Sequence, residues 1–152
     1  MTPEAFASAL PGRGVLCGID LGTKTIGLAF SDAEWALAGP GPVIRRTREA
    51  ADLAALRTIV GERHVLGFVI GLPLNMDGRP GPSAQRSRAF SRTLEREFAL
   101  PWLMWDERLT SEEAKAEMLE ADVPRAKWPE RIDAFAAAII LRSALRALVA
   151  AS

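Results

Sequence analysis

Three acidic sites in this sequence combine residue types and positions that could carry out chemistry. Asp20 lies inside an apolar segment, where an unpaired carboxylate is costly. Asp106 and Glu107 follow a second apolar segment, and Asp133 lies near the start of a long one. Each site has a structural explanation when taken alone: a turn cap for Asp20, solvated charges for the pair, and a favourable charge at the positive end of a helix for Asp133.

Taken together, these acids indicate metal-assisted hydrolysis. They belong to different elements, at strand ends or at a helix start, and in open α/β sheets ligands gather at that edge. Several carboxylates in one place would repel one another unless divalent cations neutralised them, and such oxygen ligands suit Mg²⁺ or Mn²⁺. Two ions about 3.5–4 Å apart would activate water and stabilise the leaving oxygen of a phosphodiester. This chemistry depends on the hypothesis that the acids converge.

Composition excludes several other chemistries. The 152 residues include one Cys, one His and no Tyr, which leaves no disulfide, no zinc site built from cysteines, no multi-histidine metal site and no tyrosine nucleophile. Hydrophobic residues make up 49% and charged residues 25%, as is typical of a globular protein with one domain. Cys17 and His64 are expected to be structural.

The charges are balanced overall but segregated along the chain. There are 19 basic and 19 acidic residues, so the net charge does not favour nucleic acid. Residues 79–96 hold five Arg and one Glu, whereas residues 106–122 hold seven acids. The five arginines could follow a phosphate backbone, or form a solvated helix face with Glu95 as counter-charge. They are Arg79, Arg86, Arg88, Arg92 and Arg96.

Other polar residues near the acids could contact a substrate. Thr23 and Lys24 follow the first acid and could meet a phosphate, although a solvated turn explains them equally well. Asn75 and Asp77 lie in a Gly- and Pro-rich segment and could position a substrate strand or form only a β-turn. Arg108 could bind phosphate or neutralise the acids beside it.

Hydrophobic periodicity and turn residues predict the elements that position these side chains. An apolar hairpin with a Gly-containing turn comes first, then an irregular third strand, and helices alternate with strands thereafter. The predicted strands are 15–21, 25–30, 36–44, 65–70 and 102–105, and the predicted helices are 49–60, ended by Gly61, one that begins at Ser83, 110–120 and 130–149. This order predicts an α/β fold with a mixed sheet and helices on its faces.

The domain organisation is simple. Residues 1–13 are predicted to be a flexible N-terminus and residues 14–150 a single domain. The N-terminus lacks the basic and apolar regions of a signal peptide, and no uncharged apolar run approaches the length of a membrane span. The protein is therefore expected to be cytoplasmic, with no membrane partner.

Four sequence blocks resemble the YqgF/RuvX family, RuvC-like nucleases of the RNase H-like superfamily. They are residues 18–32 (GIDLGTKTIGLAFSD), 71–78 (GLPLNMDG), 106–111 (DERLTS) and 131–137 (RIDAFAA). The first block alone is also similar to the phosphate loop of sugar kinases and chaperone ATPases. Four blocks in the family's order, spread over nearly the whole chain, are specific.

The resemblance implies an RNase H-like nuclease domain, with a mixed five-stranded sheet and helices on both faces. It implies a metal-dependent endonuclease that uses Mg²⁺ or Mn²⁺ and matures the 5′ end of pre-16S rRNA or, alternatively, resolves Holliday junctions in branched DNA. The acidic site maps onto Asp20, the Asp106–Glu107 pair and Asp133, with Glu107 favoured within the pair as the metal ligand. Thr25 departs from the family, in which many members have a basic residue, and this would weaken a phosphate contact.

Two further interpretations stay open. The Asp-x-Gly-Thr loop also fits a nucleotide-dependent phosphotransferase, although that architecture clasps nucleotide between two domains and this chain has room for one. A RuvC-like module that binds nucleic acid or nucleotide without catalysis would not need the acids. A homodimer would suit a junction substrate with two-fold symmetry.

Overall fold

The computed structural model describes residues 1–73, 77, 79–106 and 110–151, and strand β1 lies at the centre of its mixed sheet. The strands are β1 (Leu16–Leu21), β2 (Thr25–Ser31), β3 (Ala38–Arg45), β4 (Gly67–Leu72) and β5 (Trp102–Asp106). Their order across the sheet is β3-β2-β1-β4-β5. β2 is antiparallel to β1 and β3, whereas β4 is parallel to β1 and β5. All five predicted strands are present, with β4 placed slightly later in the chain than predicted.

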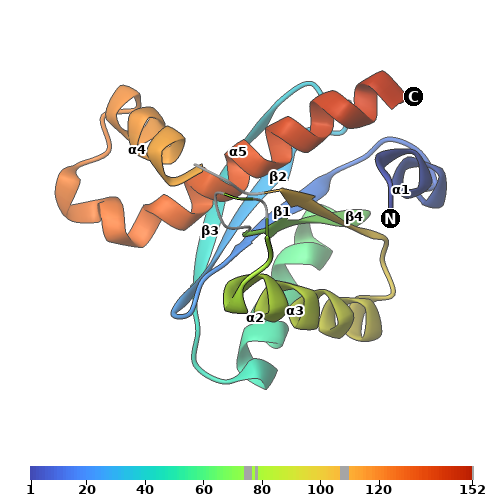
Figure 1. The fold of residues 1–152 in the computed structure, drawn as a ribbon, viewed down its shortest axis with the longest axis horizontal. Coiled ribbons are helices and arrows are strands. Elements are labelled where there is room, and N and C mark those ends of the chain that lie inside the picture. Colours follow the sequence, from blue (N-terminus) through green and yellow to red (C-terminus); the bar gives the residue numbers. More distant parts are fainter. Residues whose placement is uncertain (74–76, 78, 107–109, 152) are drawn as a thin grey trace.

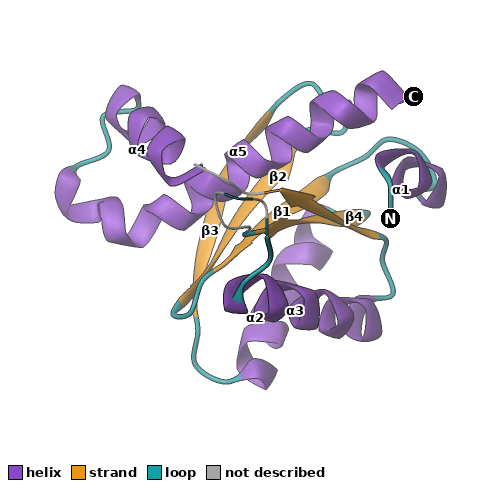
Figure 2. Cartoon of the chain, viewed as in Figure 1, coloured by secondary structure: helices purple, strands orange, loops and turns teal. Residues whose placement is uncertain are grey.

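Helices cover both faces of the sheet (Figures 1 and 2). One face carries α5 (Trp128–Ala151), with α1 (Pro3–Ala9) packed near its C-terminal end and α4 (Thr110–Glu120) against its N-terminal half. The other face carries α2 (Glu49–Arg63) and α3 (Pro82–Phe98). A short 3-10 helix (Arg125–Lys127) precedes α5. The two faces are therefore covered by different parts of the chain.

Two apolar clusters follow the alternation of side chains along the strands. Leu16 and Val69 pack toward α5, whereas the neighbouring Cys17 packs toward α2 and α3. Helix α5 approaches β1 so closely that a Cβ on Gly18 would lie 2.9 Å from the backbone oxygen of Ala137. Glycine at this position is what allows the helix and the sheet to meet.

The N-terminus forms a helix that is part of the core. Thr2 caps α1, because its hydroxyl accepts a hydrogen bond from a backbone N–H of the first turn, and Pro3 is the first helical residue. Phe6 is fully buried, and Leu10 is nearly so, in the cluster beneath α5. The sequence predicts a flexible segment over residues 1–13, whereas the structure has a helix there. So short a helix has too few apolar residues to show a periodic pattern, and its burial depends on contacts with the rest of the fold.

Two helix boundaries also differ from the prediction. Gly61 does not end α2, which continues to Arg63 and ends where His64 adopts the left-handed conformation with φ of 54°. Helix α5 begins at Trp128 rather than at residue 130, since Pro129 is tolerated in the first turn of a helix. Gly61 therefore lies inside α2 and not at its end.

Strand β3 is irregular, as the sequence predicts, and it lies at one edge of the sheet. Pro40 and Pro42 interrupt it, and its pairing with β2 shifts register between Gly27 and Ala29. Proline has no backbone N–H to donate to a neighbouring strand, and it is tolerated at the edge of a sheet for that reason. The irregularity leaves the two ends of β3 paired with β2.

One helix of the described chain is long and apolar enough to cross a membrane by composition. This segment, Arg125–Ala151, includes all of α5. Most of its apolar stretch is buried inside the protein, against the sheet, α1 and α4. Its apolarity on all sides is that of a helix buried in a core.

Replacing Gly61 by Ala is expected to raise the free energy of unfolding by about 0.5–1 kcal/mol. Gly61 lies in the last turns of α2, and a Cβ there would meet no atom within 4 Å, so the variant loses mainly unfolded-state freedom. Urea unfolding measures the change. A loss of stability would mean that α2 ends at Gly61 in the left-handed conformation, as the sequence alone predicts.

Candidate active site

Asp20 lies near the carboxyl end of β1 and on the face that α5 covers. In the antiparallel pair of β1 and β2 it stands opposite Gly27, and opposite residues project from the same face with Cβ atoms about 4.5–5.5 Å apart. Gly18, two positions earlier on β1, meets α5, so strand alternation places Asp20 on that face as well. Asp20 is half-buried there.

Asp133 comes from the second turn of α5 and rests directly on Gly27. A Cβ on Gly27 would lie 2.2 Å from the carbonyl carbon and oxygen of Asp133 and 2.6 Å from its Cβ, so only glycine permits the contact. Because Asp20 and Gly27 are cross-strand partners, the Cβ atoms of the two acids lie within about 8 Å of each other. The structure thus brings Asp20 and Asp133 together from distant parts of the sequence.

Thr25 holds the carboxylate of Asp133, and with Gly22 and Gly27 it forms what we call the Asp133 cradle. The Thr25 hydroxyl donates a hydrogen bond to Oδ2 of Asp133. Gly22 donates its backbone N–H to the Thr25 carbonyl oxygen at 2.8 Å, and a Cβ on Gly22 would lie 3.6 Å from the same Oδ2. Sequence reasoning treats Thr25 only as a weakened phosphate contact and misses this role. The signal that could reveal it is the register of the hairpin, which also pairs Gly27 with the first acid.

Of the paired acids Asp106 and Glu107, the structure describes Asp106. Asp106, the last residue of β5, is exposed and follows Trp102 and Met104 at intervals of two, and these pack toward α2 and α3. Asp106 therefore belongs to the face opposite Asp20. Glu107 and Arg108 lie outside the described residues.

Two carboxylates are what the described part of the chain contributes to this centre. Over residues 1–73, 77, 79–106 and 110–151, no three His, Cys, Asp or Glu side chains form a group that could hold a metal ion. The predicted set of ligands includes Glu107, which is not among those residues. The proximity of Asp20 and Asp133 is therefore the part of the predicted centre that the geometry supports.

The candidate substrate contacts divide between the site and a separate turn. Thr23 and Lys24 form the exposed tip of the β1–β2 hairpin, next to the Asp133 cradle. Asp77 is exposed in a turn, where its carboxylate accepts a hydrogen bond from the Arg79 backbone N–H at 2.9 Å. This contact is typical of a turn, the alternative that the sequence analysis gives to a role in positioning the substrate. Asn75 lies outside the described residues.

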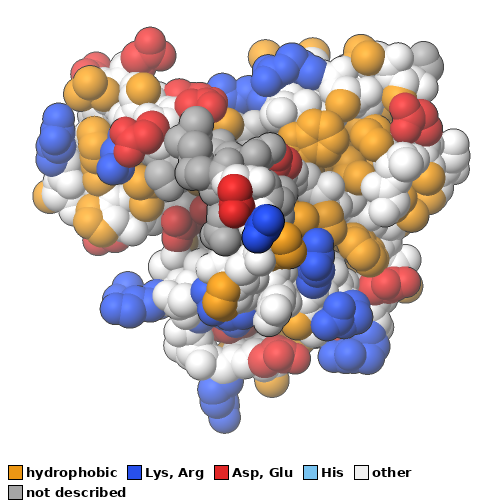
Figure 3. All heavy atoms as spheres, viewed as in Figure 1, with side chains coloured by type: hydrophobic (Ala, Val, Ile, Leu, Met, Phe, Trp, Pro, Cys, Tyr) orange, Lys and Arg blue, Asp and Glu red, His pale blue; other side chains and the backbone are white. Residues whose placement is uncertain are grey.

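The arginine-rich helix α3 covers the face of the sheet opposite Asp20. Arg88 and Arg92 are exposed on this helix, so a substrate would have to extend beyond the acids to reach them. The segregation of charge along the sequence is also visible on the surface, where basic side chains gather over the layer of α2 and α3 and acidic ones over α4 (Figure 3). The role of these two arginines stays a prediction.

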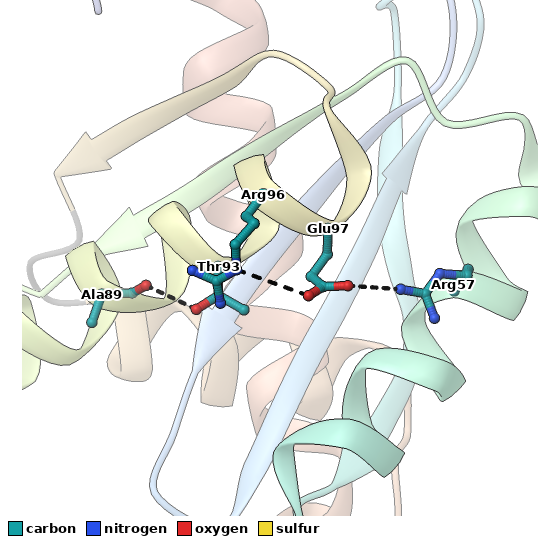
Figure 4. A network of polar contacts seen from close by, with 5 residues as sticks. All are labelled: Arg57, Ala89, Thr93, Arg96 and Glu97. Carbon is teal, nitrogen blue, oxygen red and sulfur yellow. Dashed lines mark hydrogen bonds and ion pairs between the residues drawn. The ribbon is translucent and has the colours of Figure 1, made fainter.

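A network of ion pairs joins α3 to α2 (Figure 4). Glu97 lies 3.1 Å from a guanidinium nitrogen of Arg57 and 3.9 Å from one of Arg96. Glu95 instead accepts a hydrogen bond from the Trp102 indole N–H at 3.1 Å. Of the five arginines of the predicted face, Arg96 is thus paired with Glu97, and Glu95 is held by Trp102 at the start of β5.

Cys17 and His64 lie apart from the acids. Burial raises the pKa of the Cys17 thiol far above its ordinary range, against a small opposite effect of Arg63, so the thiol stays protonated. His64 is exposed at the end of α2, where it closes the helix. Both residues have the structural roles that the sequence predicts.

Comparison with known proteins identifies the relatives of this chain. The family model for RuvX, described as Holliday junction resolvase, matches residues 14–147. A Novosphingobium aromaticivorans protein named "Putative pre-16S rRNA nuclease" is 55% identical over 140 residues, which cover 92% of this chain and 90% of the relative. A Sphingopyxis alaskensis protein of the same name is 51% identical, over 94% of this chain and 93% of its own length.

Two solved structures with the same fold are resolvases in complex with Holliday junctions. RuvC from T. thermophilus in complex with a Holliday junction substrate has a TM-score of 0.57 and 16% identity, over 91% of this chain and 97% of that one. The Fowlpox virus resolvase with substrate Holliday junction DNA has a TM-score of 0.57 and 10% identity, over 89% and 99% of the two chains. These likenesses confirm the predicted fold, an RNase H-like mixed five-stranded sheet with helices on both faces.

Gly27→Ala is expected to lower the free energy of unfolding by about 3 kcal/mol, the upper end of the usual cost of overpacking, because the new methyl group would meet backbone atoms of α5. Urea unfolding measures the loss. Gly39→Ala, in the edge strand β3, is the matched control, since a Cβ there meets no atom within 4 Å. Equal stability of the two variants would contradict the close contact between Gly27 and the backbone of Asp133, on which the proximity of Asp133 and Asp20 depends.

Proposed function

Because the chain belongs to the RuvX family, we propose that it is a metal-dependent endonuclease that hydrolyses phosphodiester bonds in structured nucleic acid. The observation that carries the proposal is the approach of Asp133 to Asp20 over Gly27. Two carboxylates that converge attract divalent cations. The names of the relatives favour pre-16S rRNA as the substrate. Cleavage at its 5′ end and action in the cytoplasm are part of this proposal.

The metal ligands of this proposal are Asp20, Asp133 and Glu107. The donor set fits Mg²⁺ or Mn²⁺, since it consists of carboxylate oxygens, and the absence of a side chain at Gly27 lets Asp133 approach the hairpin that carries Asp20. Glu107 is preferred to its neighbour because strand alternation assigns Asp106 to the other face. Bound metal would lower the pKa of a water molecule and stabilise the charge that develops on the phosphate.

The protein's own side chains orient the ligands and hold the substrate. The Thr25 hydroxyl fixes one oxygen of Asp133 by donating a hydrogen bond to it, which leaves the other carboxylate oxygen for the metal. Lys24 and Thr23, at the tip of the hairpin, would bind the phosphate nearest the acids. Arg108 and Asn75 are proposed as further phosphate contacts. A substrate long enough to extend past the edge of the sheet would also meet Arg88 and Arg92 of α3 and the turn that contains Asp77.

Junction resolution is the second candidate activity, because the resolvases that share the fold are bound to Holliday junctions. A cleavage panel separates the two candidates: a pre-16S rRNA leader and a four-way DNA junction, each with Mg²⁺, with Mn²⁺ and with EDTA. Preferential cut of the leader supports rRNA maturation. Paired cuts across the junction would support resolution and require a homodimer. Binding of either probe without any cut would favour a module that does not catalyse.

Asp20→Asn and Asp133→Asn are each expected to reduce the cleavage rate by more than about 100-fold, beyond the usual effect of residues that only support a ligand. The temperature of unfolding should stay the same or rise, because each change relieves repulsion between carboxylates. Cleavage of the better panel substrate and thermal unfolding measure the two effects.

Asp32→Asn serves as the control for these variants. The Asp32 carboxylate accepts hydrogen bonds from backbone N–H groups of Ala36 and Leu37 at 2.8 and 3.0 Å, in a turn after β2. Its cleavage rate should match that of the unaltered protein. Full activity of metal-purified Asp20→Asn would contradict the assignment of the site.

Thr25→Val is expected to weaken Mn²⁺ binding by about 10-fold or more, as is usual when a partner of a metal ligand is lost, because the Asp133 carboxylate loses its hydroxyl donor. Titration calorimetry with Mn²⁺ measures this independently of cleavage. Thr25→Ser keeps the donor and should bind the ion almost as tightly as the unaltered protein. Equal affinities of the Val and Ser variants would show that the hydroxyl does not orient the ligand.

A further inference from the structure

A groove of about 560 Å³ lies beside the acids, between strand β3 and the N-terminal end of α5. Its volume is in the range of sites that enclose a ligand of small-molecule size. Six residues line it, from the hairpin tip, from β3 and from the first turn of α5: Lys24, Thr25, Val43, Arg45, Pro129 and Glu130. Sequence analysis assigns none of the lining residues of β3 or α5 to the substrate.

The groove is continuous with the site. Thr25 lines the groove, and its hydroxyl donates a hydrogen bond to the Asp133 carboxylate, so this one residue lies between the groove and the acid. In the pairing of β2 with β3, Arg45 stands opposite Thr25 and Val43 stands opposite Gly27. Opposite residues project from the same face, which is the face of the acids. The groove therefore extends the site across the sheet toward β3.

The charges of the groove select for an anion on one wall. Lys24 and Arg45 are both exposed at this end of the sheet. Within the described chain the side chain of Arg45 makes no hydrogen bond or ion pair, whereas the side chain of its neighbour Arg46 donates to the Gly22 carbonyl oxygen at 2.7 Å. Arg46 is thus committed to the hairpin and Arg45 is available for a ligand. Glu130, on the α5 side, would repel an anion and keep it on the strand side.

We propose that this groove binds the sugar–phosphate backbone of the substrate strand next to the bond that is cut, with Arg45 and Lys24 as the phosphate contacts. The proposal rests on the proposed nuclease function and adds the path of the strand. Arg45 lies two strands away from Asp20, about 10 Å across the sheet, and two residues further along it, which makes roughly 12 Å at the usual strand spacing and rise. It would therefore meet a phosphate one or two nucleotides from the scissile one. The nucleic-acid strand would run from the acids across β2 toward β3.

The test measures binding in the cleavage-inactive Asp20→Asn protein, so that affinity is read without turnover. The probes are a fluorescent RNA hairpin with a single-stranded extension and a DNA four-way junction of the same charge density, each titrated by anisotropy at several salt concentrations. Arg45→Gln should weaken binding several-fold and reduce the salt slope by about 0.7–0.9, the value for one lost phosphate contact. Glu130→Gln should strengthen binding, because it removes the negative wall.

Arg146→Gln is the matched control, since Arg146 is also an exposed arginine of this face but lies about 20 Å further along α5 than Asp133. Its affinity and salt slope should equal those of the parent protein. Thermal unfolding of each variant shows that the fold is kept. Loss of affinity for the RNA alone would restrict the groove to RNA, and equal loss for both probes would support recognition of the backbone of either.

Unchanged affinity and salt slope in Arg45→Gln would contradict the proposal that the groove binds the substrate backbone. Equal effects of Arg45→Gln and Arg146→Gln would contradict it as well. Failure of the nuclease proposal is seen elsewhere, as retained cleavage by Asp20→Asn. In the active protein, Arg45→Gln should raise KM several-fold and leave kcat nearly unchanged, because the contact is made equally before and during the reaction. A loss confined to kcat would contradict a role in holding the substrate.

Discussion

The close approach of α5 to the β1–β2 hairpin is the constraint on which the site depends. Side chains at Gly18 and Gly27 would occupy the space that the helix backbone fills. The contact is stabilised by burial of the apolar residues of α5, including Ala137 and Leu141. That burial carries Asp133 to Asp20 and offsets the repulsion between two carboxylates, which neither element would tolerate without the packing around it.

Local pattern predicts much of this arrangement. Apolar alternation and a Gly-containing turn locate the β1–β2 hairpin, and an acid inside an apolar segment marks Asp20. The pairing of Asp20 with Gly27 depends on the register of the hairpin. A slip of one residue would place the side chains of one strand on the other face, and local sequence pattern does not determine this register. The role of Thr25 depends on the same register, and for that reason sequence reasoning finds the acids but not the residues that hold them.

Tertiary contacts explain the other differences. Phe6 is buried only because the sheet and α5 surround a helix of one to two turns. Alternation along β5 assigns Asp106 to one face of the sheet, but only the fold shows which face carries α5. Arg45 escapes the sequence analysis because prolines interrupt the alternation of β3 and hide the face on which it lies. Each of these features depends on partners that lie far away in the chain.

The two prolines of β3 also restrict how other molecules can meet this side of the sheet. Pro40 and Pro42 offer no backbone N–H at the edge, so another extended chain would find an incomplete ladder of donors there. Edge-to-edge aggregation through β3 is disfavoured as a result. A partner that approaches along this edge has to be recognised by side chains instead of by strand addition, and this keeps the edge accessible in a cell crowded with nascent polypeptides.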